Sequence, residues 1–197
     1  NNGFSDRKKI NVQREDNEAY RVALSHLADC QSIWIAELSA DAQSAIIAFV
    51  NNHEDLFLRI FAGSSFLTRI IRTRPDLLGE LAVEGPDVFC EKILTRLYEL
   101  DLSCDRDILM RDLRLYRQSI SLVTAMADIA GIWSLEKVTG TLTDFADASV
   151  RVSLVWLLKN KSAQYGLDTP LTADQCQCVI LGTVSYTHLT LPTQRIV

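Results

Sequence analysis

Three arginines are the clearest candidates for a binding role in this sequence. Arg111, Arg114 and Arg117 fall three residues apart within a segment of helical periodicity, so they form a positive strip that turns only slowly around the helix. An arginine guanidinium can bind a phosphate through two parallel hydrogen bonds, which makes the strip a candidate for facing a nucleotide or phosphate. Pairing with Asp107 or Asp112 on a solvated helix face is the commoner outcome for such a strip. The spacing alone leaves both interpretations open.

The other residues of chemical interest form no catalytic or metal site. Asp144 and Asp147 lie three apart, but no histidine or further carboxylate converges on them, which favours solvent exposure. His26 and His53 have no orienting partner at helical spacing and are predicted to be surface or capping residues. We therefore predict no catalytic residue and no bound metal in this chain.

The five cysteines are predicted to be reduced thiols. They are odd in number and scattered along the chain, whereas a disulfide framework uses cysteines in pairs. Cys176 and Cys178 would share one face of a strand, but a zinc site needs further ligands close by. Because the histidines lie far away in sequence, core or edge positions are the simpler interpretation of this pair.

The composition describes a globular protein rather than a nucleic-acid or membrane binder. The 197 residues are 48% hydrophobic and 23% charged, which is enough to bury a real core. A net charge of −5 argues against affinity from phosphate neutralisation. No apolar run approaches the roughly 18 residues that span a bilayer and no signal-peptide pattern opens the chain, so we expect a cytoplasmic protein. The first residue is Asn1, and the natural start is expected upstream of it.

The elements that position the arginines are predicted to be helices. Residues 1–14 are polar and basic without periodicity and are expected to form a loose arm. From residue 15 to about residue 100, apolar residues at helical spacing predict short helices joined by tight turns. The start and stop signals are a cap at Ser39, a capping box of Asn52 with Asp55, an end at Gly63, and starts at Pro75 and at Gly85-Pro86-Asp87.

Two longer helices follow and form the strongest pattern in the chain. The first apolar stripe holds Leu109, Leu113, Tyr116, Ile120, Val123, Ala127 and Ala130, and the second holds Val138, Leu142, Phe145, Ser149, Val152 and Trp156. Gly131-Ile132-Trp133 separates the two stripes, and Ser134 can cap the second helix. We predict an antiparallel hairpin of helices roughly 35 to 45 Å long, at 1.5 Å per residue. Trp133 is expected to plug the end of this hairpin rather than line a ligand site.

One short strand is predicted near the C-terminus. The segment from Gln175 to Gly182 reads as a buried strand that runs into a glycine turn. Such a turn commonly opens an α/β catalytic core, because its backbone N–H groups can face a phosphate. The pattern is then lost from Val184 onwards. The predicted fold is therefore all-α, with short helices, a long hairpin and one strand that begins an absent nucleotidyltransferase core.

Several of these segments resemble one enzyme family, the bifunctional glutamine synthetase adenylyltransferase/adenylyl-removing enzymes. The similar segments are Phe61-Ala62-Gly63-Ser64-Ser65-Phe66-Leu67, Arg74-Pro75-Asp76-Leu77-Leu78, the arginine-bearing segment 109–117, the segment 127–148 around Gly131-Ile132-Trp133, and Val179-Ile180-Leu181-Gly182. The resemblance covers roughly residues 56–182. The spacing between its blocks is similar to that of the N-terminal, adenylyl-removing half of such enzymes.

The resemblance implies a function for the intact protein that this polypeptide cannot perform alone. Family members add AMP to a tyrosine of glutamine synthetase with ATP, and their N-terminal half removes it with phosphate as ADP. The resemblance also implies Mg²⁺ as cofactor and a PII-type signalling protein as partner. In relatives the strand continues as Gly-x-Gly-Lys-Leu-Gly-Gly and then Ser-x-Asp-x-Asp, whose carboxylates hold the metal. Neither motif follows Gly182 here, so we expect the fragment to be inactive.

The expected organisation is an arm at 1–14, a helical region at 15–174, the first core strand at 175–183 and a tail at 184–197. The tail resembles the translation of a sequencing adaptor that recurs in metagenomic assemblies, and a natural β-prone tail is the alternative. The rival to the enzyme interpretation is a non-catalytic α-helical interaction module, whose exposed apolar stripes would dock a partner helix.

Overall fold

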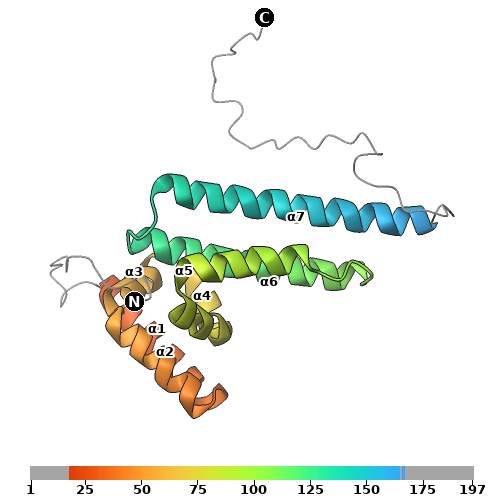
Figure 1. Cartoon of the computed structure of the whole chain (residues 1–197). Helices are drawn as coiled ribbons and strands as arrows, with labels where there is room; N and C mark the ends of the chain where they lie inside the picture. Colours follow the sequence, from red (N-terminus) through yellow and green to blue (C-terminus); the bar gives the residue numbers. More distant parts are fainter. Residues whose placement is uncertain (1–17, 165, 167–197) are drawn as a thin grey trace, which may run out of the picture. The chain divides into compact units, whose positions relative to one another are not determined.

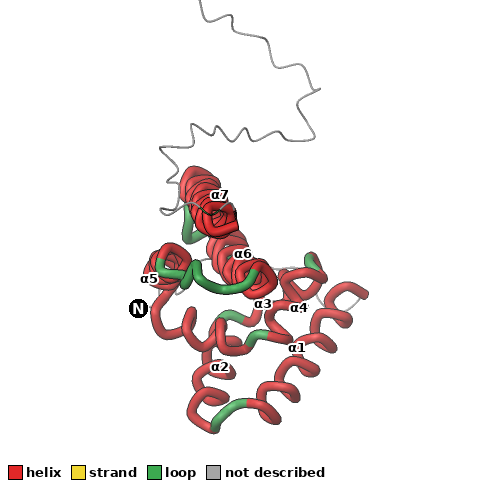
Figure 2. Tube along the Cα trace, turned by 90° about the vertical axis from the view of Figure 1, so that its right-hand side faces the viewer, coloured by secondary structure: helices red, strands yellow, loops and turns green. Residues whose placement is uncertain are grey.

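A computed structural model describes residues 18–164 and 166 of the chain. Its regular elements are helices throughout the described part (Figures 1 and 2). They are α1 (Glu18–Glu37), α2 (Ala40–Asn52), α3 (Glu54–Gly63), α4 (Ser65–Thr73), α5 (Pro75–Tyr98), α6 (Arg106–Ile129) and α7 (Leu135–Gln164). The all-α prediction is confirmed. The predicted arm at 1–14, strand at 175–183 and tail at 184–197 lie outside the described residues.

The described helices belong to two compact units, which meet within α7. The first unit ends at Ser153 and contains α1 to α6 with the first part of α7, and the second begins at Leu154. Within the first unit, α1 lies closely against α3, α2 against α5, and α5 against α6. None of the close helix pairs in the described part includes α7. Its first part instead reaches the core through Val138 and Phe145, which pack against it.

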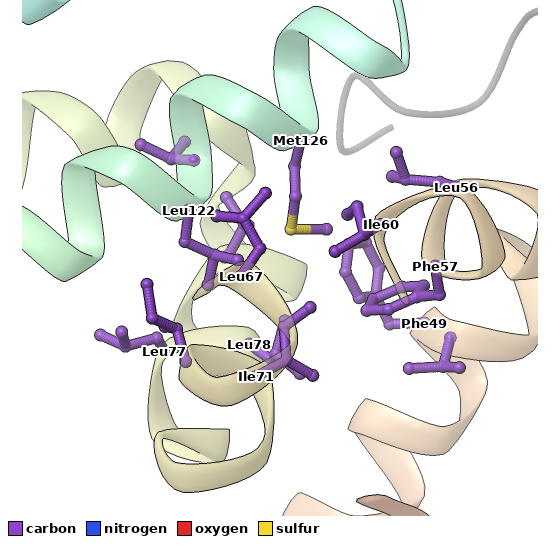
Figure 3. Close-up of a cluster of buried hydrophobic side chains, with 14 of the residues drawn as sticks. Phe49, Leu56, Phe57, Ile60, Leu67, Ile71, Leu77, Leu78, Leu122 and Met126 are labelled. Atoms are coloured by element: carbon purple, nitrogen blue, oxygen red, sulfur yellow. The ribbon is translucent and has the colours of Figure 1, made fainter. Parts of the chain in front are cut away.

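The core of the first unit gathers side chains from many helices. Figure 3 shows Leu122 and Met126 of α6 near Ile60 of α3 and Leu67 of α4. The largest fully buried side chains are Trp34, Phe57, Phe89, Ile46, Ile60, Ile70, Ile71, Leu78, Leu81, Ile93, Leu97 and Ile120. Burying one such side chain contributes roughly 1.5 to 3 kcal/mol. Burial in α6 is concentrated between Ser119 and Ala127, so its first half is less buried than the apolar stripe predicts.

Most of the predicted helix boundaries are confirmed. Ser39 is the N-cap residue of α2, although its side chain makes no capping hydrogen bond. The Leu67 amide N–H donates to Ser64 Oγ at 3.3 Å, which caps α4. The predicted capping box of Asn52 with Asp55 is wrong. Because α2 runs on through Asn52, the N-cap residue of α3 is His53.

Gly85 reverses the chain inside α5. It adopts φ 77° and ψ 169°, a conformation essentially restricted to glycine, and Pro86 starts a second helical segment. The Arg96 guanidinium reaches the Glu80 carboxylate at 3.2 Å. In a straight helix these residues would stand about 24 Å apart at 1.5 Å per residue. The two segments of α5 therefore lie side by side, as the predicted start at Gly85-Pro86-Asp87 implies.

A tight turn separates α6 from α7. The N–H of Gly131 donates to the Asp128 carbonyl and that of Ile132 to the Ala127 carbonyl, both at 2.8 Å, and Gly131 has φ 64°. This is the Schellman arrangement that ends many helices. The Lys137 N–H then donates to Ser134 Oγ at 3.3 Å, which caps α7. The predicted boundary between the two long helices is confirmed (Figure 1).

Trp133 closes the turn between α6 and α7. Its side chain is buried and belongs to the core cluster, as expected of an aromatic residue that plugs the end of the hairpin. The Lys137 ammonium lies 5.4 Å from the centre of the Trp133 ring and 3.4 Å from an Asp87 carboxylate oxygen. The first turn of α7 is therefore tied to the second segment of α5.

The same substitution at two glycines should have opposite effects on stability. Gly85→Ala should lower the free energy of unfolding by roughly 1 to 3 kcal/mol, because alanine resists this backbone conformation. Gly140→Ala should raise it by up to about 1 kcal/mol, because Gly140 is helical and an added Cβ meets nothing within 4 Å. Urea unfolding followed by far-ultraviolet circular dichroism measures both. Equal tolerance at the two positions would show that the reversal does not depend on glycine.

Candidate functional site

The arginine strip lies on the exposed side of α6. Arg111, Arg114 and Arg117 are all exposed, while Ile120 and Val123 on the same helix are buried in the core. Because α6 packs against α5 and against α3 and α4, its backbone is held on the side opposite the strip. The three guanidinium groups thus stand on a supported helix and face outwards.

The three arginines differ in their ion pairs. The Arg111 guanidinium pairs with its neighbour Asp112 at 2.9 Å, and its side chain remains 64% exposed. Arg114 and Arg117 have no acidic partner within 4 Å among the described residues. The predicted pairing with Asp112 is therefore present at Arg111. Arg111 is a paired surface residue, whereas Arg114 and Arg117 keep their donors available for an anion.

Sequence reasoning missed a charged network beside this helix. Lys92 Nζ lies 2.5 Å from Glu84 and 3.1 Å from Glu80, and Arg96 also pairs with Glu80. Hydrogen bonds to Glu84 and Glu80 raise the pKa of the Lys92 ammonium above its ordinary value. The sequence does contain a signal for this network. Glu80 and Glu84 are four residues apart, and so are Lys92 and Arg96, so each pair lies on one helix face. Only the reversal at Gly85 brings the two pairs together.

The pKa of Tyr116 responds to charges of both the network and the segment that bears the arginine strip. Burial raises the pKa of its phenol, the positive charge of Arg96 opposes the shift, and the charge of Asp112 adds to it. The charges of Arg96 and of Asp112, the partner of Arg111, therefore both act on this phenol. The sequence places Tyr116 in an apolar stripe, but the structure gives it this polar neighbourhood as well.

The remaining residues of interest lie apart from the strip. Asp144 and Asp147 are exposed on α7, and the described residues contain no group of three or more metal-ligating side chains. Cys30 and Cys90 are buried free thiols. Burial raises the pKa of Cys30 to about 11 and also that of Cys90, so both thiols are poor nucleophiles. None of the described helices is both long and apolar enough to cross a bilayer.

The two described histidines both contact aromatic rings. The His26 ring lies 6.4 Å from that of Phe61. The His53 ring packs edge-on against Phe49, with centroids 4.9 Å apart. His53 joins α2 to α3, and burial lowers the pKa of its imidazole below 6.5. It is therefore a capping-region residue, as expected, and part of its ring is buried.

A family model matches most of this helical region. The model is described as glutamate-ammonia ligase adenylyltransferase and matches residues 55–185, which include α4 to α7, nearly all of α3, and the arginine strip. The chain belongs to this family. The match also runs beyond α7 through the predicted strand at 175–183.

Curated relatives carry the same family name. A bifunctional glutamine synthetase adenylyltransferase/adenylyl-removing enzyme of Bradyrhizobium diazoefficiens is 29% identical over 140 residues, which is 70% of this chain and 14% of the relative. The enzyme of that name from Rhodopseudomonas palustris is 30% identical over 66% of this chain and 14% of its own length. That from Caulobacter vibrioides is 26% identical over 77% and 16%. The matched part is thus about a seventh of these family members. No solved structure matches the chain.

Protonation of His53 should lower the stability of the fold at acidic pH. Because burial favours the neutral imidazole, the folded pKa lies below the ordinary value of 6.5, and the unfolded chain binds the proton first. The free energy of unfolding should therefore decrease as the pH falls from about 6.5 towards the folded pKa. Urea unfolding at several pH values measures this decrease. His53→Gln should remove its share of it, and an unchanged profile in that variant would assign the effect to other groups.

Proposed function

We propose that this chain is the helical region of the adenylyl-removing half of an enzyme that regulates glutamine synthetase. The observation that supports the proposal most is the family match over residues 55–185, together with relatives named for both activities. In the proposed reaction of the whole enzyme, phosphate releases AMP as ADP from a tyrosine of glutamine synthetase. The opposing activity would attach AMP from ATP.

The helices would serve this chemistry as a scaffold beside the catalytic core. Arg114 and Arg117 lack acidic partners in the described part of the chain and stand on a helix supported by α5. The N–H donors of a guanidinium group without an acidic partner remain available for phosphate oxygens. We assign them the role of facing the nucleotide or the attacking phosphate, with Arg111 less available because of Asp112.

Catalysis itself would belong to residues that this sequence lacks. Nucleotidyl transfer needs carboxylates that hold Mg²⁺ against the phosphate oxygens, and neither the lysine-bearing turn nor the aspartate pair follows Gly182. We therefore propose that the polypeptide as given is inactive and that Mg²⁺ acts in the whole enzyme only. Glutamine synthetase and a PII-type signalling protein are the proposed partners, in the cytoplasm.

Incubation with adenylylated glutamine synthetase, phosphate and Mg²⁺ tests the inactivity directly. We expect ADP release at the background rate, because no residue of this chain supplies the metal-binding carboxylates. A coupled assay for ADP gives the rate, and an intact relative such as that of Rhodopseudomonas palustris serves as positive control. ADP release by this chain above background would overturn the assignment of catalysis to the missing core.

Titration with ADP tests the role of the arginines. Arg114→Gln and Arg117→Gln should each weaken ADP binding roughly two- to five-fold, the range expected for one exposed ionic contact. Arg111→Gln is the matched control and should change binding less, because Asp112 already engages that guanidinium. Isothermal titration calorimetry at low salt measures all three. Equal effects at the three positions would indicate a diffuse charge effect without a specific site.

A further inference from the structure

The exposed face of α4 presents an aromatic ring and two arginines. Phe66, Arg69 and Arg72 follow one another at steps of three residues, and each step turns about 60° around the helix, so Arg69 stands at the centre of the face. All three are exposed. Leu67 and Ile71, on the opposite side of α4, are buried in the core (Figure 3). The α4 face, formed by Phe66, Arg69 and Arg72, is therefore carried by a helix that packs firmly into the core.

The positive charge of the α4 face is not neutralised within the described part of the chain. The Arg69 guanidinium lies 5.9 Å from the centre of the Phe66 ring. Neither Arg69 nor Arg72 has an acidic partner within 4 Å among the described residues. α4 itself contains no acidic residue, and Asp76, the first one after it in sequence, pairs with Arg74 at 2.8 Å. Two guanidinium groups are thus available to carboxylates of another molecule.

The shape and the chemistry of the α4 face favour a protein as its occupant. The face of one helix is convex, whereas small molecules bind in concave pockets that bury most of their surface. The net charge of −5 argues against a nucleic acid. Arginine and aromatic side chains are enriched in protein–protein interfaces, and guanidinium groups form their strongest hydrogen bonds with anionic oxygens. The occupant that fits is an acidic patch on another protein.

We propose that the α4 face docks an acidic patch of glutamine synthetase. This inference rests on the proposed function, because the relatives of the chain are named for that enzyme. Arg69 and Arg72 pair with carboxylates of the patch, and the Phe66 ring packs against an apolar side chain beside them. These contacts hold glutamine synthetase on the helical region while the catalytic core acts on the tyrosine. The role differs from that of Arg114 and Arg117, which are assigned to the nucleotide or phosphate.

Binding to immobilised, adenylylated glutamine synthetase tests the α4 face. Biolayer interferometry with the full chain measures the dissociation constant. Arg69→Glu and Arg72→Glu should each weaken binding roughly three- to twenty-fold, because each replaces an attraction by a repulsion. Arg151→Glu is the matched control, since it makes the same change at an exposed arginine of α7, and it should change binding by less than about two-fold. Circular dichroism verifies that each variant is folded.

Salt gives a second readout of the same contact. Raising NaCl from about 50 mM to about 300 mM should weaken binding of the unmodified chain and reduce its advantage over the two α4 variants, because salt screens exposed charges. Equal loss in Arg151→Glu and the α4 variants would indicate a diffuse charge effect and overturn the docking proposal. Binding that is unchanged in both α4 variants would also overturn it, while the proposed function would stand. An unmodified chain that does not bind at all would overturn it too, and the gene sequence downstream of Gly182 would then decide separately on the proposed function.

Discussion

The backbone reversal at Gly85 is the constraint on which the rest of this helical region depends. A continuous α5 of 24 residues would be about 36 Å long and could not bring Arg96 to Glu80. Because the chain turns back, Phe89, Ile93 and Leu97 are buried in the core, and α5 as a whole is the main neighbour of α6. Asp87 in the second segment of α5 also pairs with Lys137 in the first turn of α7. The conformation of one glycine therefore determines how the two segments of α5 meet.

The sequence predicts local structure better than it predicts which residues of different helices come into contact. Pro75, Gly85-Pro86, Gly131 and Ser134 act through their own backbone or through a residue a few positions away, so their roles can be inferred without the fold. The capping box at Asn52 failed because the competing signal, continuation of α2, is equally local. The network of Glu80, Glu84, Lys92 and Arg96 was missed because its members meet only after the reversal. Leu142 was predicted to lie in the apolar stripe of the second long helix, but its side chain is 44% exposed, because the rotation of α7 against the core cannot be inferred from spacing alone.

The arginine strip shows how far spacing can define a site. Three-residue steps correctly indicate a shared helix face, and the structure adds that Asp112 engages one of the three arginines. What distinguishes Arg114 and Arg117 is the lack of an acidic partner in the described part of the chain. Their proposed role connects the scaffold to the family that the chain belongs to.

The proposed function requires a catalytic core that would follow the segment ending at Gly182. The most direct measurement is an independent determination of the gene sequence downstream of that codon. We predict codons for Gly-x-Gly-Lys-Leu-Gly-Gly in place of residues 184–197, followed by Ser-x-Asp-x-Asp. A stop codon, or a continuous reading frame without these motifs, would contradict the enzyme interpretation and favour a helical interaction module.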